Sequence, residues 1–589
     1  MRTSARLSMV LWLVMGTVAT AEIRPEFAMD YDPVLKSPEP LKVFVETYQP
    51  LWLKALARPE ADMQRRVAET IADAHVYGFP KLDEAKPLLI KIVSADDTHP
   101  AARFAAAHAL IVFADERSAD TLFKASQKYG ADLRQLIEPA LAKWRFAPIV
   151  NVWRKRLEAK DTRLRDLVLA IHGMAEVGDQ SAVPSLLAML HDPLRAGAIR
   201  LEAARSAGRL QTSGLEPDAE RLTRQSPGPI SNRLCAAALL GQHDSETAIA
   251  ALLRLAIDVE PSVAAAALTR LNAINHDLVV PIAEQAMRND DANVRQRGVD
   301  AYVARPTPER VAFVCSLLDD PHPTVRAGVR ESLFRLAQRA ELDAVIRHTA
   351  SGVLANDSWR GQEQAALLLS ALDHKPAVTR LVELLESTRD EVMVATAWGL
   401  RVLAVPDTLP AILDKASRQT EARAKNQAQS KGLDDQVAHL CEALGQMKYA
   451  PAEPLLRRYI PKNFTMGTFS RGAAIWSLGH LHAGISDEPL AVLLVERLTE
   501  PIGPLPPEVE RVRHASAISL GRMQSKSQTE RMRAFLGPQV GIDPTSLAIR
   551  WAIHELTGEL LPEPERPTFS RSGWFLEPLD YKVRVSPSP

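Results

Sequence analysis

The chain has 589 residues, and its 71 basic and 72 acidic residues give a formal net charge of −1. This balance lacks the basic surplus with which nucleic-acid-binding proteins meet phosphates, so no nucleic acid is expected as a partner. Apolar residues make up 46% of the sequence but aromatic residues only 5%. That is typical of an Ala- and Leu-rich helical protein and argues against a strand-rich sandwich.

Residues 1–21 have the features of a secretory signal peptide. Arg2 and Arg6 precede an apolar run over 7–18, and the small residues at 19–21 fit a cleavage site after Ala21. The apolar run is shorter than the ~20 residues of a membrane-spanning helix, which favours cleavage over an uncleaved anchor. We therefore expect export to the periplasm or the extracellular space, without stable membrane insertion.

The next part of the chain is predicted to cap a helical array. Residues 22–50 contain four prolines between Pro25 and Pro40 and are expected to be irregular. Residues 51–97 are predicted to form a degenerate first unit whose second helix starts near Arg65. Atypical terminal units of this kind shield the end of a repeat stack.

From Ala102 onward a helical unit recurs about fourteen times. Each unit has a marker position, usually Arg after an apolar residue, and successive markers are 31 to 45 residues apart. Leu often follows seven residues later on the same helical face, and a second apolar run precedes each marker. The pattern predicts an all-α fold, an α-α superhelix of about 14–15 helical hairpins over residues 51–561. Arg occupies the marker at Arg103, Arg134, Arg165, Arg200, Arg233, Arg295, Arg326, Arg360, Arg471 and Arg513.

These units resemble HEAT repeats. The fragments Ala-Gly-Arg-Leu (207–210), Leu-Gly-Gln-Met (444–447), Leu-Gly-His-Leu (478–481) and Leu-Gly-Arg-Met (520–523) resemble a bacterial subgroup, the phycobilisome-lyase HEAT-like repeats. The resemblance covers roughly residues 45–560. It implies an α-solenoid but not a particular task, because this repeat serves many unrelated functions.

Two insertions and a tail interrupt or follow the repeats. Residues 415–436 are rich in charged and amide side chains and are expected as an extended solvated helix or a mobile loop, whereas residues 501–508 contain four prolines and cannot be helical throughout. Each insertion is expected either to join a binding surface or to be a tolerated loop. Residues 562–589, rich in Pro and Ser, are expected to lie along the last repeats or to remain disordered with a recognition motif.

Few residues suggest a catalytic or metal-binding role. Cys235, Cys315 and Cys441 lie in different apolar helical patterns and are expected as buried free thiols. His480 and His482 could share a metal ion with a carboxylate, but side chains two positions apart on a helix diverge. The pair His554-Glu555 is a single copy of a motif that deoxyhypusine hydroxylase, a HEAT-repeat di-iron enzyme, uses four times. We therefore predict no catalytic residue, metal or cofactor.

The marker arginines have a structural and a functional interpretation. At the edge of a stacked core a buried charge needs a partner, and aspartates near the turns between repeats are expected to supply it. The alternative is a groove that binds anions. The expected partners are Asp161, Asp290, Asp291, Asp390 and Asp543.

Three residues are candidates for contact with another protein. Trp398, Trp476 and Ile518 each lie five positions after a marker, in a column of mixed residues that suggests partial exposure. A semi-exposed Trp on a rigid helix is a typical interface anchor, although large side chains there would equally fill gaps between repeats.

These features together predict a non-catalytic scaffold or assembly factor that binds protein along its curved second-helix surface in the cell envelope or periplasm. The alternative is an enzyme or accessory subunit of a secreted redox or lyase-type system, with a bilin-lyase-like or metal-dependent activity taken from the HEAT-like family.

Overall fold

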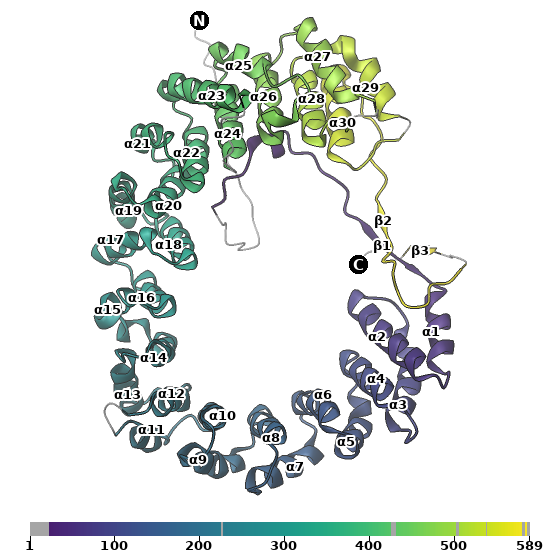
Figure 1. The fold of residues 1–589 in the computed structure, drawn as a ribbon, viewed down its shortest axis with the longest axis vertical. Helices are drawn as coiled ribbons and strands as arrows, with labels where there is room; N and C mark the ends of the chain where they lie inside the picture. Colours follow the sequence, from purple (N-terminus) through teal and green to yellow (C-terminus); the bar gives the residue numbers. More distant parts are fainter. Residues whose placement is uncertain are drawn as a thin grey trace, which may run out of the picture. The chain divides into compact units, whose positions relative to one another are not determined.

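The computed structural model describes residues 23–224, 228–425, 432–501, 506–537, 539–579 and 583–585. The signal peptide predicted at residues 1–21 lies outside these ranges. Within them the chain forms thirty α-helices and one small sheet of three strands (Figure 1). None of these helices combines the length and the apolar character that crossing a membrane requires.

The chain divides into two compact units, each of which includes a segment from the opposite end of the sequence. The N-terminal unit comprises residues 36–306, 538–543 and 562–589. The C-terminal unit comprises residues 1–35, 307–537 and 544–561. We describe each unit by itself.

The N-terminal unit contains sixteen of the described helices and all three described strands. The strands are β1 (Leu41–Val45), β2 (Thr568–Phe569) and β3 (Val583–Val585). The helices are α1 (Tyr48–Leu56), α2 (Ala61–Tyr77), α3 (Lys86–Ser94), α4 (Pro100–Val112), α5 (Ala119–Lys128), α6 (Ala131–Lys143), α7 (Ala147–Glu158), α8 (Leu164–Val177), α9 (Val183–His191), α10 (Gly197–Leu210), α11 (Glu216–Thr223), α12 (Ile230–Leu239), α13 (Glu246–Ala256), α14 (Pro261–Ile274), α15 (Ala283–Met287) and α16 (Ala292–Ala304).

The C-terminal unit contains the other fourteen described helices and a short 3₁₀ turn at Ala28–Asp30. The helices are α17 (Pro308–Ser316), α18 (Pro323–Leu336), α19 (Ala340–Ala355), α20 (Trp359–Ala371), α21 (Val378–Leu384), α22 (Asp390–Leu403), α23 (Leu409–Ala424), α24 (Leu433–Gln446), α25 (Glu453–Arg457), α26 (Thr468–Leu481), α27 (Glu488–Thr499), α28 (Glu510–Arg522), α29 (Thr529–Leu536) and α30 (Pro544–Thr557).

Consecutive helices pair as hairpins, from α1 with α2 to α29 with α30, so the described chain has fifteen of them. Every marker position lies in an even-numbered helix, from Arg103 in α4 to Ala548 in α30. Within each unit, an even helix packs against the next even helix, for example α2 against α4 and α24 against α26. The predicted all-α superhelix of hairpin repeats is therefore confirmed.

The glycine of the short repeat fragments sits where two even helices approach most closely. A Cβ atom added at Gly208 would lie 2.1 Å from the backbone oxygen of Leu239, and one at Gly445 would lie 2.3 Å from Cβ of Ser477. Real side chains do not occupy such positions without displacing the neighbouring helix. The fragments that resemble HEAT-like repeats thus mark helix contacts, which is why they predict the fold and say little about function.

The insertions and the tail differ partly from expectation. Residues 415–424 continue α23, and 426–431 lie outside the described residues; Pro501 and residues 506–509 are not helical, and 502–505 lie outside. The described part of the tail, residues 562–579 and 583–585, belongs to the N-terminal unit and not to the last repeats, so that alternative is wrong. Its β2 pairs in parallel with β1, joining Leu41 to Thr568, and β3 pairs with β1 in antiparallel register, because β1, inside the segment expected to be irregular, offers open strand edges.

Candidate peptide-binding face

Residues 23–32, which we call the N-terminal segment, precede all the repeats and pack on even helices of the C-terminal unit. Figure 1 shows this purple segment beside α24, α26 and α28. The segment makes only one short 3₁₀ turn and otherwise has no regular structure. We call the residues that receive it the segment-binding face; they are Arg401 on α22, His439 and Glu442 on α24, Phe469, Trp476 and His480 on α26, and Arg511 and Arg522 on α28.

Two apolar side chains anchor the segment. Phe27 stacks on His439 with a centroid distance of 4.5 Å and on Phe469 with one of 4.8 Å. Met29 is only 1% exposed, and a Cβ atom at Gly472 of α26 would lie 3.2 Å from its sulfur. The missing side chain of Gly472 therefore leaves room that Met29 and the Arg511 side chain, whose Cγ would lie 2.8 Å away, fill together.

Four hydrogen bonds connect the face to the main chain of the segment, one of them from Arg522 to the carbonyl oxygen of Asp32 at 3.0 Å. Arg401 donates to the carbonyl oxygen of Glu26 at 2.6 Å, and the indole N–H of Trp476 donates to that of Asp32 at 2.8 Å. The carboxylate of Glu442 accepts from the backbone N–H of Met29 at 2.9 Å. Such contacts bind an extended polypeptide whatever its side chains, because every peptide unit offers the same donor and acceptor.

The acidic side chains of the segment meet cations. Asp30 forms an ion pair with Arg511, whose guanidinium also lies over the Phe469 ring at 4.4 Å. Asp32 contacts Arg522 at 2.7 Å and His480 at 3.0 Å. Although burial opposes ionisation of Asp32, the hydrogen bond from His480 and the charge of Arg522 hold its pKa below 3.8.

The floor of the face contains a buried polar cluster. Glu442 is fully buried, with Arg401 at 3.3 Å and His439 at 3.4 Å. Burial lowers the pKa of His439, so its ring is neutral near pH 7 and stacks on Phe27 as an aromatic surface. Arg401 neutralises Glu442, which leaves Arg511, Arg522 and His480 to receive acidic side chains.

The structure places the three predicted interface residues on even helices but not at the exposed positions expected. Trp398 is 7% exposed, Trp476 1% and Ile518 0%, so the expectation of partial exposure is wrong. The reason is packing: α22 and α28 each contact an even helix on both sides, and the N-terminal segment covers Trp476. Trp476 contacts a docked segment of its own chain, and a role for any of the three in binding another protein stays a prediction.

Sequence reasoning missed most of the face. The sequence does indicate that Arg401 and Arg522 need distant partners, because neither has an acidic residue three or four positions away on its own helix. Their partners are Glu442 and Asp32, which lie far away along the chain. Only folding brings these residues together.

The marker arginines mostly satisfy backbone carbonyl groups at the end of the preceding helix. Arg103 donates to the carbonyls of Val93 and Ala95, and Arg326 to those of Asp320 and Pro321. This geometry places a cation at the negative end of a helix dipole. The ladder therefore has a structural use at these positions.

Two carboxylate partners of the ladder differ from those expected. Arg134 pairs with Asp166 and Arg233 with Asp258, neither of which was predicted. Asp290 contacts Arg295 through its backbone carbonyl at 2.8 Å. Asp291 caps α16 by accepting from the backbone N–H of Asn293. An aspartate in a turn can cap a helix as readily as it can pair with an arginine. Its position in the sequence therefore does not tell which partner it has.

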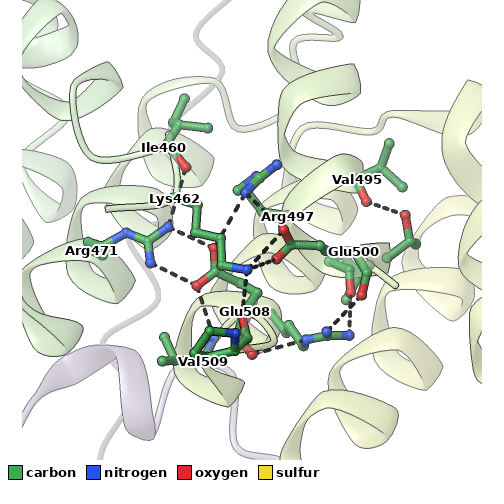
Figure 2. Close-up of polar contacts among 12 residues, drawn as sticks. Ile460, Lys462, Arg471, Val495, Arg497, Glu500, Glu508 and Val509 are labelled. Carbon is green, nitrogen blue, oxygen red and sulfur yellow. Dashed lines mark hydrogen bonds and ion pairs between the residues drawn. The ribbon is translucent and has the colours of Figure 1, made fainter. Parts of the chain in front are cut away.

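One marker arginine fixes the Pro-rich insertion. Arg471 is 1% exposed and makes two hydrogen bonds, of 2.7 and 2.8 Å, to the fully buried carboxylate of Glu508 (Figure 2). Lys462 donates to the carbonyl of Pro506 at 2.6 Å and contacts Glu500 at 3.0 Å. These contacts hold both ends of the insertion, which makes this cluster part of the core.

One group of side chains has the donors of a metal site. Oxygen and nitrogen atoms of Glu453, His482 and Asp487 lie within 4.8 Å of one another. Arg457, however, contacts Glu453 at 2.6 Å and Asp487 at 2.7 Å, so one guanidinium already pairs with both carboxylates. His480 turns instead to Asp32, and His554 is exposed. His480 and His482 thus contact different partners, Asp32 and Glu453.

The three cysteines are buried and unpaired, as expected from their apolar patterns. Burial raises the pKa of the Cys315 thiol to about 12. Such a thiol stays protonated and is a poor nucleophile or metal ligand.

No family model matches the sequence, and no curated protein matches it. Solved structures do. Karyopherin Kap121p bound to the extreme C-terminus of the protein phosphatase Cdc14p aligns with a TM-score of 0.51 at 11% identity, over 87% of this chain and 57% of that one. Kap95p with RanGDP gives 0.48 at 12% identity over 87% and 72%, and importin beta 0.45 at 14% over 86% and 74%. The chain therefore has the fold of a HEAT-repeat solenoid.

Proposed function

We propose that this protein is a non-catalytic scaffold that binds a partner protein on its even helices and acts in the cell envelope or periplasm. The observation that carries the proposal is the N-terminal segment. It is an irregular stretch of polypeptide, held by side chains from four successive even helices through main-chain hydrogen bonds, an aromatic stack and ion pairs. A surface that holds one such stretch has the chemistry to hold another.

Two further points support the proposal. Kap121p, whose fold is similar, has been solved bound to the extreme C-terminus of another protein. The signal-peptide features of residues 1–21 support export, and the HEAT-like fragments support a bacterial source.

Site-specific photocrosslinking tests the scaffold. The full chain, carrying p-benzoylphenylalanine at Phe469 on the face or at the exposed Leu493 of α27, is irradiated in its native envelope fraction, and crosslinked products are identified by mass spectrometry. We expect one reproducible partner at Phe469 and none at the Leu493 control. Recovery of the chain without any protein partner but with an equivalent of metal or pigment would contradict the scaffold and favour an enzyme or a redox subunit.

A further inference from the structure

We propose that the segment-binding face recognises partner segments of the form aromatic–x–apolar–acid–x–acid, and that residues 27–32 of this chain occupy the face as an internal competitor. The inference rests on the proposed scaffold function and specifies its partner. The occupant to which we commit is an acidic segment of another protein with an aromatic anchor, which takes the same short turn as Ala28–Asp30.

The spacing follows from which side chains of the segment the face receives. Phe27, Met29, Asp30 and Asp32 each contact the face. Tyr31, in contrast, is 56% exposed. The face therefore reads four of six successive positions, and the main-chain bonds to Glu26, Met29 and Asp32 fix the register between them.

Charge complementarity selects the acidic positions. Arg511 and Arg522 project from the two ends of α28, so they are placed to receive acids at two separate positions of the segment. Glu442, the acidic residue of the face itself, already pairs with Arg401. A basic or neutral segment would bring no carboxylate to the places that Asp30 and Asp32 occupy beside Arg511 and Arg522.

The aromatic position is equally selective. Phe27 fits between the His439 and Phe469 rings, with Arg511 at 5.9 Å from its own ring. An aliphatic side chain would fill part of this volume but would lose the stacking and cation–π geometry. A partner therefore needs an aromatic residue three positions before its first acid.

The N-terminal segment is held in a way that lets it detach while the repeats stay folded. The structure describes no helix or strand between Asp30 and β1, so release of residues 23–32 breaks no repeat and no strand pairing. The ion pairs that hold it are partly exposed, with side-chain exposed fractions of 48% for Asp32 and 38% for Asp30. A segment of matching chemistry supplied by another protein replaces the same contacts one for one.

Competition makes a quantitative prediction for the full chain. The probe is a labelled peptide with the sequence of residues 23–34, and its affinity is measured by fluorescence anisotropy. In the wild type the internal segment closes the face, so the apparent affinity falls by the fraction of open molecules. We expect the double variant Phe27→Ala/Asp32→Asn to bind the probe at least about tenfold more tightly than the wild type.

Two controls assign the effect to the face. Tyr31→Ala changes an exposed residue of the same segment and should leave the wild-type affinity unchanged. Adding Arg522→Ala to the Phe27→Ala/Asp32→Asn background removes a cation of the face and should weaken the binding of the probe about three- to fivefold. A thermal melt of each variant verifies that the repeats remain folded.

The proposal is overturned if the probe binds the wild type and the double variant equally, or if Arg522→Ala has no effect. These outcomes differ from a failure of the scaffold itself. If the probe fails but a native partner still crosslinks at Phe469, the recognition rule is rejected and protein binding stands. If only metal or pigment is recovered with the chain, both proposals fall.

Discussion

Each unit receives a chain segment from outside its repeats, but the two segments are held by different physics. In the N-terminal unit the tail pairs β2 with β1 and buries Trp574 against Trp52; the indole of Trp52 also donates to the carbonyl of Phe575 at 2.9 Å. In the C-terminal unit the N-terminal segment has no strand pairing and relies on half-exposed ion pairs and on hydrogen bonds from side chains.

This difference distinguishes the tail, which is a permanent part of the fold, from the N-terminal segment, which another polypeptide can replace. Backbone pairing and buried indole rings do not titrate and are lost only when the local structure unfolds. Ion pairs at a partly exposed surface weaken with salt and with acid, and a competing charge replaces them. We therefore expect the tail to behave as part of the fold and the N-terminal segment to behave as a ligand.

The largest effect is expected where a buried ion pair belongs to the core. Replacing Arg471 by Ala leaves the buried Glu508 with only the more distant Arg497, at 3.7 Å, as a cation and should lower the stability of the C-terminal unit by about 3 kcal/mol. Arg522→Ala, at the partly exposed pair with Asp32, should cost less than about 1 kcal/mol. Denaturant unfolding followed by hydrogen exchange in α26 measures both, and equal losses would erase the distinction between core and segment contacts.

The tail should respond next most strongly. Trp574→Ala removes an indole that is 8% exposed and contacts Trp52 and Tyr77, so we expect a loss of about 3 kcal/mol in the N-terminal unit. Leu579→Ala, at a position that is 98% exposed, is the matched control and should change nothing. Calorimetry provides the measurement, and a tail that tolerates Trp574→Ala would be as exchangeable as the N-terminal segment.

Acid should release the N-terminal segment before the tail. Because docking lowers the pKa of Asp32 below 3.8, the docked state gains stability above that pH and loses it as the pH falls through the lowered value. Protection of the segment from hydrogen exchange should therefore drop below about pH 4 while β1 stays protected. In Asp32→Asn the pH dependence of the segment should be reduced; an unchanged profile would place its origin elsewhere.

Added salt should have the smallest effect on hydrogen exchange, but it should distinguish the N-terminal segment from the tail most clearly. At about 1 M salt the Debye length is ~3 Å, so the pairs of Asp30 and Asp32 are screened. We expect faster exchange in residues 23–32 by a factor of a few and no change in β1. A salt response of equal size in both regions would show that the two contacts do not differ in kind.

The repeat architecture was predictable because its signals are local. The marker and the apolar run before it recur within each hairpin, and all fourteen markers fall in even helices. The docked ends were not predictable in the same way. Asp32 meets Arg522 and Thr568 meets Leu41 across nearly the whole sequence, and no local periodicity encodes such pairings.

The candidate site shows the same limit at the level of single residues. Trp476 was a candidate because few large apolar residues occupy the position five residues after the marker in other repeats. That position predicted partial exposure. In the structure the N-terminal segment covers the Trp476 side chain. Arg511 offered no signal, since Glu508 lies three positions before it as an apparent partner; Glu508 instead turns to Arg471. Only the folded chain decides which acid each arginine receives.

The most direct test of the account measures displacement. An isotope-labelled full chain, whose own segment is distinguished by mass from an unlabelled peptide of residues 23–34, is followed by hydrogen exchange as the peptide is added. We expect the backbone N–H of Met29, which donates to Glu442, to lose protection as the peptide binds, while Trp476 and its helix remain protected. Saturating binding of the peptide with full protection retained at Met29 would contradict this expectation.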